Sequence, residues 1–285
     1  MKKKISLING TFSDFISVYD RGLLFGDGFF ETMKWITVNG KKKVVFWSRH
    51  IDRLKKSCNK AKIKCPSKRM LDEYKNTIFK KCAQFNQFKG VLKIIITRGE
   101  GGRGYSFEKN MKPSVIFQSF PITLPDEKSL LEGVEVDICK TSINQNNFLS
   151  GLKHLNRIDS VLASDDIKKK IYDLIFLDSN NLIIEGIKTN IFFIKKKKLI
   201  TPKISSSGIN GIMRQIVIEK YSSLYEELFE SNINVNQISE FDGAFLTNSI
   251  IGILPIKNIK KTGFVIDDKI TKLRKLIEES EITED

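Results

Sequence analysis

The sequence is poor in the residues that build the commonest catalytic and metal sites. It contains two His, four Cys and six Pro among 285 residues. The Cys form no Cys-x-x-Cys pair and two His add few nitrogen ligands, so we predict no metal and expect reduced thiols. A Ser-His-Asp triad would have to recruit His50 or His154, and the Gly-x-Ser-x-Gly elbow of many hydrolases is absent.

Long apolar runs and internal repeats are also lacking. No stretch of eighteen apolar residues occurs, so no membrane span is predicted. The apolar stretch after the Lys residues at 2–4 is too short for a secretory signal, and we expect a cytoplasmic protein. Hydrophobic residues make up 41% of the chain, which is enough apolar material for a folded core.

The formal net charge of +15 raises the question of nucleic-acid binding. Nucleic-acid-binding surfaces favour Arg interleaved with aromatic residues, whereas this chain has nine Arg and 39 Lys. Most visible are four short Lys runs, at 2–4, 41–43, 168–170 and 195–198. We interpret the charge as a solvated surface that attracts anionic substrates, and predict no nucleic-acid partner. A basic nucleic-acid-binding module without activity is the alternative, and salt-sensitive DNA binding would favour it.

The apolar patterns predict a mixed α/β protein. Strands are expected at 5–8, 29–38, 91–97, 114–120, 134–139, 173–177, 182–185, 190–194 and 243–247. Helices are expected at 51–63, 70–85, 156–170 and 212–228. Many strands follow one another without a crossover helix, so the sheets should be mixed rather than doubly wound.

Two prolines close together mark the expected domain boundary. Pro121 and Pro125 precede a charged stretch, which is typical of a linker. We therefore expect a smaller α/β domain at 1–120, a linker at 121–130 and a larger α/β domain at 131–285.

A glycine-rich loop, Gly99-Glu-Gly-Gly-Arg-Gly104, follows the strand that ends at Thr97 and Arg98. It lacks the Gly-Lys-Ser/Thr ending of a P-loop, and taken alone it could be a flexible hairpin. An Arg at the end of a buried strand, beside backbone with few side chains, suits an anionic ligand.

Lys153 lies in the stretch Gly151-Leu-Lys-His-Leu-Asn-Arg157, between a polar loop and a predicted helix. In a chain of 39 Lys, the ordinary interpretation is a solvated side chain. A Lys held in apolar surroundings loses its proton more readily, however, and its neutral amine can form a Schiff base.

Four stretches occur in an order, together with Lys153, that resembles one enzyme family. They are Asp20-Arg-Gly-Leu-Leu-Phe-Gly-Asp-Gly-Phe-Phe-Glu31, His50-Ile-Asp-Arg-Leu54, Glu185 with Thr189-Asn190, and Gly208-Ile-Asn-Gly-Ile-Met-Arg214. Together they resemble the class IV pyridoxal-phosphate enzymes of fold type IV, the D-amino acid aminotransferase-like fold. The resemblance implies two α/β domains, pyridoxal 5'-phosphate as cofactor, and a homodimer in which a loop of the neighbouring subunit closes the pocket.

The resemblance assigns roles to three charged residues. Lys153, in the C-terminal domain, resembles the lysine that forms the Schiff base with the cofactor. Glu185 resembles the carboxylate that faces the pyridine nitrogen and keeps it protonated. Arg53 matches the arginine on the phosphate, where its planar fork suits phosphate oxygens.

The resemblance also implies two backbone sites for the phosphate. Gly211, Ile212 and Met213 stand where N–H groups at a helix start, aided by the helix dipole, receive it. Asn248 and Ser249 resemble a second turn on the phosphate side. The plainer alternatives are a strand end in water for Glu185 and a turn cap for Ser249.

Within this family the details are similar to the aminodeoxychorismate lyases. Met213 stands where branched-chain and D-amino acid aminotransferases commonly have Thr, and Phe30 where D-amino acid aminotransferases have Tyr. Phe30 with Thr32 fits the lyase pattern, and so do the runs 97–106 and 153–157. A branched-chain or D-amino acid aminotransferase of the same fold is the alternative.

The lyase resemblance implies conversion of 4-amino-4-deoxychorismate to 4-aminobenzoate and pyruvate, a reaction of folate biosynthesis, with Lys153 taking the proton from the amine-bearing carbon. The residues expected around the substrate, besides Phe30 and Thr32, are Arg98, Arg103, His154, Asn156 and Arg157. The three Arg are candidates for substrate carboxylates, although Arg157 could instead brace the site and each could be a surface residue.

Overall fold

The computed structural model describes residues 4–221 and 224–284. The chain divides into two compact units. Unit 1 consists of Met1–Thr123, Leu152–Asn156 and Glu281–Asp285, and unit 2 of Leu124–Gly151 and Arg157–Ser280. Among the described residues, no helix is long and apolar enough to cross a membrane.

Unit 1 is built on a six-stranded sheet in the order β2-β1-β6-β5-β3-β4, in which every neighbouring pair is antiparallel. The strands are β1 (Ile5–Ile8), β2 (Thr11–Phe12), β3 (Gly28–Val38), β4 (Lys41–Val44), β5 (Gly90–Thr97) and β6 (Ser114–Phe120). In β3 the side chains of Phe29, Glu31, Met33 and Trp35 are buried, while the residues that alternate with them are partly exposed. This period of two gives the sheet one face toward the core.

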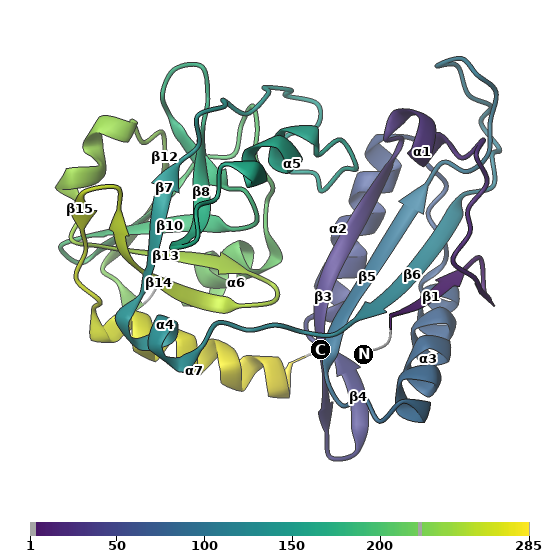
Figure 1. The fold of residues 1–285 in the computed structure, drawn as a ribbon, viewed down its shortest axis with the longest axis horizontal. Coiled ribbons are helices and arrows are strands. Elements are labelled where there is room, and N and C mark those ends of the chain that lie inside the picture. The colour runs from purple at the N-terminus through teal and green to yellow at the C-terminus, as the bar shows by residue number, and fades with distance from the viewer. Residues whose placement is uncertain (1–3, 222–223, 285) are drawn as a thin grey trace. The chain divides into compact units, whose positions relative to one another are not determined.

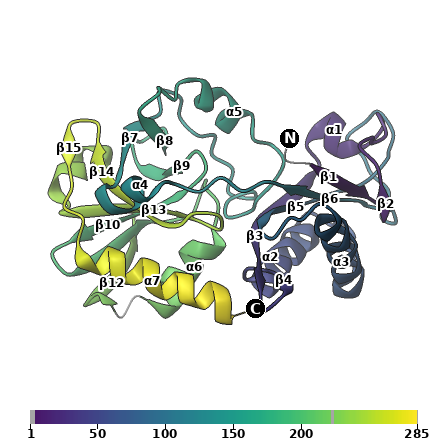
Figure 2. The ribbon, with the colours of Figure 1, turned by 60° about the horizontal axis from the view of Figure 1, so that its bottom comes forward.

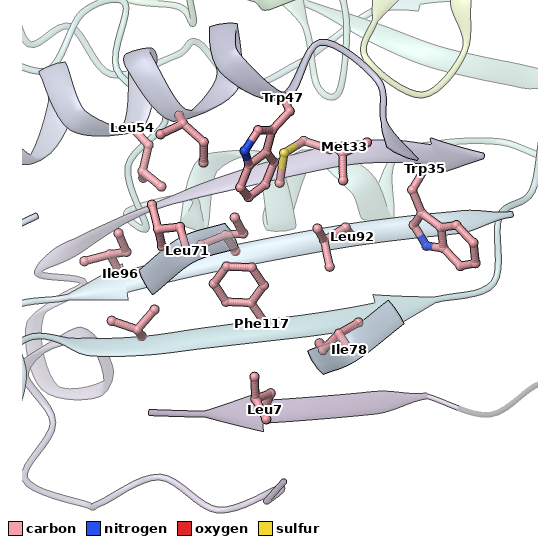
Figure 3. Packing of buried hydrophobic residues seen from close by; sticks show 14 of the residues in the cluster. Leu7, Met33, Trp35, Trp47, Leu54, Leu71, Ile78, Leu92, Ile96 and Phe117 are labelled. Atoms are coloured by element: carbon pink, nitrogen blue, oxygen red, sulfur yellow. The ribbon is translucent and has the colours of Figure 1, made fainter. Parts of the chain in front are cut away.

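Three helices accompany this sheet: α1 (Arg21–Phe25), α2 (Trp47–Lys60) and α3 (Lys68–Gln84). The longer two, α2 and α3, cover the same face (Figures 1 and 2). Figure 3 shows Trp47 and Leu54 of α2 and Leu71 of α3 directed at the sheet. All three are buried, and each such side chain stabilises the fold by about 1.5–3 kcal/mol.

Unit 2 is built on a nine-stranded sheet in the order β12-β11-β10-β13-β14-β7-β8-β9, with β15 paired to β14. The strands are β7 (Val134–Ile138), β8 (Ile171–Leu177), β9 (Ile183–Gly186), β10 (Asn190–Lys195), β11 (Lys198–Pro202), β12 (Glu227–Ser231), β13 (Gly243–Asn248), β14 (Gly252–Ile259) and β15 (Thr262–Gly263). The pairs β11–β12, β14–β7 and β7–β8 are parallel and the others antiparallel. The predicted α/β fold is therefore confirmed, with a mixed sheet in unit 2 and an antiparallel one in unit 1.

The helical elements of unit 2 are α4 (Glu127–Glu132), α5 (Ile158–Asp165), α6 (Ile212–Lys220), the 3-10 helix η2 (Val235–Glu240) and α7 (Asp268–Thr283), whose last residues group with unit 1. Of these, α6 packs on β13 and α4 on β14. The β9–β10 connection, the start of α6 and the β13–β14 turn are the parts of unit 2 that carry the candidate site.

Two predicted helices are too long. The helix expected at 156–170 is α5 and ends at Asp165, and the one expected at 212–228 is α6 and ends at Lys220. Leu228 instead belongs to β12, which pairs in parallel with β11. The helical spacing of apolar residues continues past the end of α6, but the pairing of β12 with β11 makes this stretch a strand. Residues 222–223 lie outside the described part of the chain.

The segment that carries Lys153 groups with unit 1. The backbone of the segment explains this grouping. Phe30 N donates to Lys153 O over 2.9 Å, and Leu155 N donates to Gly28 O over 3.0 Å. The segment thus pairs with the start of β3 although 123 residues separate Lys153 from Phe30 in the chain.

Candidate active site

The segment that carries Lys153 is held by its backbone against β3 of unit 1. His154 forms an antiparallel bridge with Phe29, between the two hydrogen bonds that flank it. The Lys153 amine lies 4.4 Å from the centroid of the Phe30 ring. The predicted Schiff-base lysine therefore has an aromatic face beside its amine, and its main chain is fixed.

A second lysine, Lys93, lies beside the same ring. Phe30 and Thr32 point away from the helix-covered face of β3, and Thr32 pairs in register with Lys93 of β5. The Lys93 amine lies 5.0 Å from the Phe30 centroid, and burial lowers the pKa of Lys93. Lys93 belongs to none of the motifs, although its place as a single charge inside the apolar run 91–97 is a visible signal.

On the helix-covered face, Arg53 is bound to the buried carboxylate Glu31. Arg53 Nε donates to Glu31 Oε1 over 2.8 Å and Nη2 to Oε2 over 2.5 Å, so the pair is bidentate. His50 Nδ1 lies 2.6 Å from the same Oε2. Because Glu31 is only 1% exposed, this pairing holds the Arg53 guanidinium between β3 and α2.

Glu31, Arg53 and His50 lie close enough to change one another's ionisation. Burial opposes ionisation of Glu31, but Arg53 and His50 outweigh it and lower the pKa of Glu31 to about 2. Burial, together with the charges of Arg53 and Lys153, lowers the pKa of His50 despite the opposing effect of Glu31. The ring is therefore neutral near pH 7, with Nδ1–H donating to Glu31.

Arg98, which is expected near a substrate carboxylate, forms its hydrogen bonds within unit 1 in this structure. Its Nε and Nη2 form a bidentate pair with Asp27 at 2.7 and 3.0 Å. It also donates to the carbonyl oxygens of Lys62 and Ala61, each at 3.0 Å. Four of the five guanidinium hydrogens are thus used inside unit 1, and the side chain is buried.

The glycine-rich loop is held by Arg21, a residue that the sequence analysis did not single out. Its guanidinium bonds to Asp27 at 3.0 Å and to the carbonyl oxygens of residues 104, 105 and 106 at 2.8, 2.9 and 3.3 Å. Arg103 lies exposed on this loop. Asp27 therefore joins two buried arginines, and Arg103 is the arginine of the loop that remains a candidate for the substrate.

Asn156 holds the C-terminal end of the segment that carries Lys153. Its Nδ2 donates to Gly26 O over 3.3 Å. Gly26 has φ +64°, and a Cβ there would lie 2.6 Å from Asn156 Oδ1. The Asn156 amide thus supports the backbone at the end of α1, at a position where a side chain larger than that of glycine would clash. This contact favours a structural role for Asn156 over contact with substrate.

In unit 2, Glu185 lies at the end of β9 and is held by two neutral donors. Asn190 Nδ2 donates to Glu185 Oε2 over 3.2 Å, and Ile209 N donates to the same oxygen over 2.8 Å. The carboxylate is 5% exposed. Burial lowers the pKa of Arg157, while the charge of Glu185 raises it, so Arg157 lies within electrostatic reach of this carboxylate and suits the bracing role.

A buried aspartate supports the β9–β10 connection. Thr189 Oγ1 donates to Asp173 Oδ2 over 2.7 Å, and burial raises the pKa of Asp173. A Cβ on Gly186 would lie 2.3 Å from Thr189 Oγ1 and 2.6 Å from Asp173 Oδ2, so the backbone passes closer to this pair than a side chain would allow. Glu185 and Asn190 therefore lie on either side of a connection whose backbone shape is tightly constrained.

The start of α6 has the features of an anion site. Gly211 is its N-cap and supplies no side-chain acceptor, and Ile212 and Met213 form the first turn. The first N–H groups of a helix lack partners inside it and lie at the positive end of its dipole. Arg214, paired with Glu230 and with Pro202 O, anchors this turn to the sheet.

The turn after β13 lies next to Asn190, because Asn190 pairs in register with Thr247. Asn248 Oδ1 accepts from the N–H groups of Ile250 and Ile251 at 2.9 and 3.0 Å, and its Nδ2 donates to Lys188 O over 3.0 Å. Asn248 thus shapes the turn, and Ser249 is the residue that follows it. Among the described residues, no group of three or more His, Cys, Asp and Glu could hold a metal ion.

Comparison with known proteins identifies relatives along almost the whole chain. Residues 28–259 match the model of the family described as amino-transferase class IV. Aminodeoxychorismate lyase of Vibrio harveyi is 28% identical over 272 residues, which are 95% of this chain and 97% of the relative. D-alanine aminotransferase of Bacillus licheniformis is 26% identical over 246 residues, or 86% and 83% of the two chains.

A solved structure of a lyase is also similar to this chain. The crystal structure of 4-amino-4-deoxychorismate lyase from Pseudomonas aeruginosa superposes with a TM-score of 0.87 and 28% identity, covering 96% of this chain and 98% of that one. Lyase and aminotransferase relatives are thus similar to this chain at nearly the same identity. Identity alone therefore leaves the choice of reaction to the residues of the site.

Proposed function

Because this chain is an enzyme of the class IV aminotransferase family, we propose that it is a pyridoxal-phosphate-dependent lyase that converts 4-amino-4-deoxychorismate to 4-aminobenzoate and pyruvate. The observation that carries the choice of reaction is the Phe30 ring, 4.4 Å from the Lys153 amine. A phenol at this position would add a proton donor and acceptor beside the lysine, and phenylalanine has neither. The similarity to two lyases over nearly full length supports the same choice.

The residues present fit pyridoxal phosphate. The start of α6, with a glycine N-cap, would receive the phosphate on the N–H groups of Gly211, Ile212 and Met213. Arg53 would add a guanidinium to the phosphate and Glu185 a carboxylate to the protonated pyridine nitrogen. The turn at Asn248 and Ser249 would supply the second phosphate contact.

Lys153 has the central chemical role. When bound, the cofactor withdraws electrons from the carbon that carries the substrate amine. Lys153 would hold the cofactor through its side-chain amine and, with substrate bound, would take the proton from that carbon. The C–O bond to the enolpyruvyl group then breaks, its electron pair leaves with the oxygen, and enolpyruvate takes up a proton to become pyruvate. The carbon ring becomes aromatic, which makes the step strongly downhill.

Borohydride reduction tests the cofactor assignment. The protein incubated with pyridoxal phosphate should show visible absorbance that disappears on reduction, with the reduced label on the peptide that contains Lys153. Lys153→Ala should show neither, whereas Lys93→Ala should keep the label on Lys153. A label on Lys93 or on another lysine would refute the assignment.

Turnover without an acceptor tests the reaction. A lyase needs no keto acid, so excess 4-amino-4-deoxychorismate alone should give pyruvate and 4-aminobenzoate in equal amounts over many turnovers. Product formation that stops near one equivalent per site would contradict the lyase.

The second candidate is an aminotransferase, which the similarity to D-alanine aminotransferase favours. Such an enzyme would have to deliver the proton to the cofactor and then run the reverse sequence with a keto acid. Dependence of amino-acid turnover on an added keto acid would support it.

We also propose a homodimer, because each unit exposes a group of large apolar side chains. In unit 1 these lie around α1 and the glycine-rich loop, and they include Phe15, Val18, Tyr19, Leu23 and Tyr105. In unit 2, Ile158, Val161 and Leu162 are exposed on α5. Contiguous exposed apolar side chains typically mark an interface. Sedimentation at assay concentration should give a dimer, and a fully active monomer would refute the proposal.

A further inference from the structure

We propose that Asn190 is a positioning residue that fixes Glu185 and the start of α6 relative to each other, so that one amide aligns the groups proposed to bind opposite ends of the cofactor. This inference rests on the proposed function, since it gives Asn190 a purpose through Glu185 and α6. The contacts themselves all lie within unit 2.

The Asn190 amide closes a ring of hydrogen bonds with Glu185 and Ile209. Nδ2 donates to Glu185 Oε2 over 3.2 Å and to Ile209 O over 2.9 Å. Ile209 N then donates to the same Glu185 oxygen over 2.8 Å. The two hydrogens of Nδ2 thus bind a side chain on β9 and a backbone carbonyl two residues before the N-cap of α6. A shift of the Glu185 carboxylate would therefore be transmitted to the backbone before α6, and the reverse.

The carbonyl oxygen of the same amide lies against the helix start. A Cβ on Gly211 would lie 2.1 Å from Asn190 Oδ1, well inside any allowed contact. The N-cap of α6 therefore approaches Asn190 closely because it is glycine, and Asn190 touches both Glu185 and the cap. The position of this N-cap determines the position of the N–H groups of Ile212 and Met213.

Asn190 is itself held firmly on both sides. It is the first residue of β10, and it pairs in register with Thr247 of β13. The preceding residue, Thr189, donates to the buried carboxylate Asp173. The side chain of Asn190 is buried, so its rotamer is enclosed by packing. A residue fixed in this way can orient others, which a mobile surface amide could not.

The chemistry of an amide suits this position better than that of the alternatives. An amide orients a carboxylate by donating hydrogen bonds without neutralising its charge, as Lys or Arg would. A carboxylate at position 190 would repel Glu185 and lose both donors, and an apolar residue would leave Glu185 with one donor fewer in a buried place. The amide thus orients the Glu185 carboxylate without removing its charge.

The test compares Asn190→Asp with Asn258→Asp, which removes a hydrogen bond from a side-chain amide on β14 to Lys260 O. Asn190→Asp should weaken pyridoxal-phosphate binding about ten- to a hundredfold, measured by absorbance titration, because two hydrogen bonds are lost, one of them to a charged group. The added negative charge should also move the pH midpoint of the visible absorbance upward. Asn258→Asp should leave both within about twofold of wild type.

A double-mutant cycle separates a positioning role from a general loss of stability. In the Glu185→Gln background, Asn190→Asp should weaken cofactor binding clearly less than in the wild-type background, because the repelled carboxylate is gone while the hydrogen bond to Ile209 O is still lost. Urea unfolding of each apoprotein shows whether the variants fold, and Asn190→Ser serves as the smaller, uncharged substitution if Asn190→Asp does not. For whichever variant folds, effects that add independently in the cycle, or a cofactor affinity equal to that of Asn258→Asp, would overturn the inference. A wild-type protein that binds no pyridoxal phosphate would overturn the proposed function instead.

Discussion

Two buried carboxylates, one in each unit, are held by different kinds of donor. Glu31 of unit 1 is paired with the Arg53 guanidinium and the His50 imidazole. Glu185 of unit 2 is held by the neutral amides of Asn190 and Ile209. A cationic partner balances the charge of a buried carboxylate within the protein, whereas amide donors orient a carboxylate without neutralising it.

The difference assigns different tasks to two residues of the same type. Glu31 should serve mainly the fold and the placement of Arg53, and Glu185 should serve mainly the chemistry. Substituting both in the same way, Glu→Gln, keeps the shape and removes the charge. Measuring stability and turnover for each variant therefore tests the comparison directly.

The largest effect expected is the loss of stability in Glu31→Gln. The substitution leaves Arg53 and His50 without their anionic partner in a buried place, and breaking such a pair costs about 3–5 kcal/mol. Urea unfolding of the apoprotein measures this. Glu73→Gln is the control, because Glu73 forms an exposed pair with Arg69 that should be worth less than about 1 kcal/mol. Equal unfolding midpoints for the two variants would contradict the structural role of Glu31.

Glu185→Gln should show the opposite pattern. We expect kcat to fall by about a hundredfold or more, since the loss of one preorganised charge commonly costs about 2.7–4 kcal/mol of transition-state stabilisation. Cofactor should remain bound, and the unfolding free energy should change less than in Glu31→Gln. Single-turnover kinetics and urea unfolding measure the two quantities, and near-wild-type kcat would remove Glu185 from its assigned role.

Acid should reveal the charge state of the unit 1 group. The pKa of Glu31 is about 2 in the folded protein and 4.5 in the unfolded reference, so its stabilisation is complete above about pH 4.5 and is lost as the pH falls toward 2. His50 has a folded pKa below its reference of 6.5, so the unfolded chain binds its proton first and stability falls below that pH as well. Glu31→Gln should flatten the unfolding free energy between pH 4.5 and 2, and His50→Gln the part just below pH 6.5. Unchanged pH profiles would contradict these charge states.

The smallest effect expected is that of Arg103→Gln. Arg103 is exposed, so the unfolding free energy should stay within about 0.5 kcal/mol of wild type. If it binds a substrate carboxylate, KM should rise several-fold while kcat changes little. Arg98→Gln should instead destabilise the fold, because Asp27 loses a buried bidentate partner. Equal stability losses in both variants would remove the distinction between them.

Local patterns predicted much of the fold. Strands such as β3, β5 and β10 and helices α2 and α3 were visible from periodicity, and the α/β class followed from their order. The length of α6 was not predictable in the same way, because the apolar residues at the end of the expected helix pair with β11 as part of β12.

The motifs indicated which stretches carry function but not the partner of each side chain. Arg98 was expected to face an anionic ligand, yet its hydrogen bonds go to Asp27 and to two carbonyls that lie far away in sequence. Glu31, His50 and Asn190 each lay within a motif and received no role, because their contacts depend on how β3 meets α2 and how β9 meets α6. Such contacts between distant segments leave little trace in a single sequence.

The measurement that tests the central claim most directly compares the two reactions in one preparation of the wild-type protein loaded with pyridoxal phosphate. Pyruvate released from 4-amino-4-deoxychorismate is followed in one arm, and keto-acid-dependent transamination of D-alanine and of branched-chain amino acids in the other. The proposed function predicts that pyruvate and 4-aminobenzoate form in equal amounts and that kcat/KM for this release exceeds that of any transamination. Transamination that equals or exceeds pyruvate release would contradict it and establish the aminotransferase in its place.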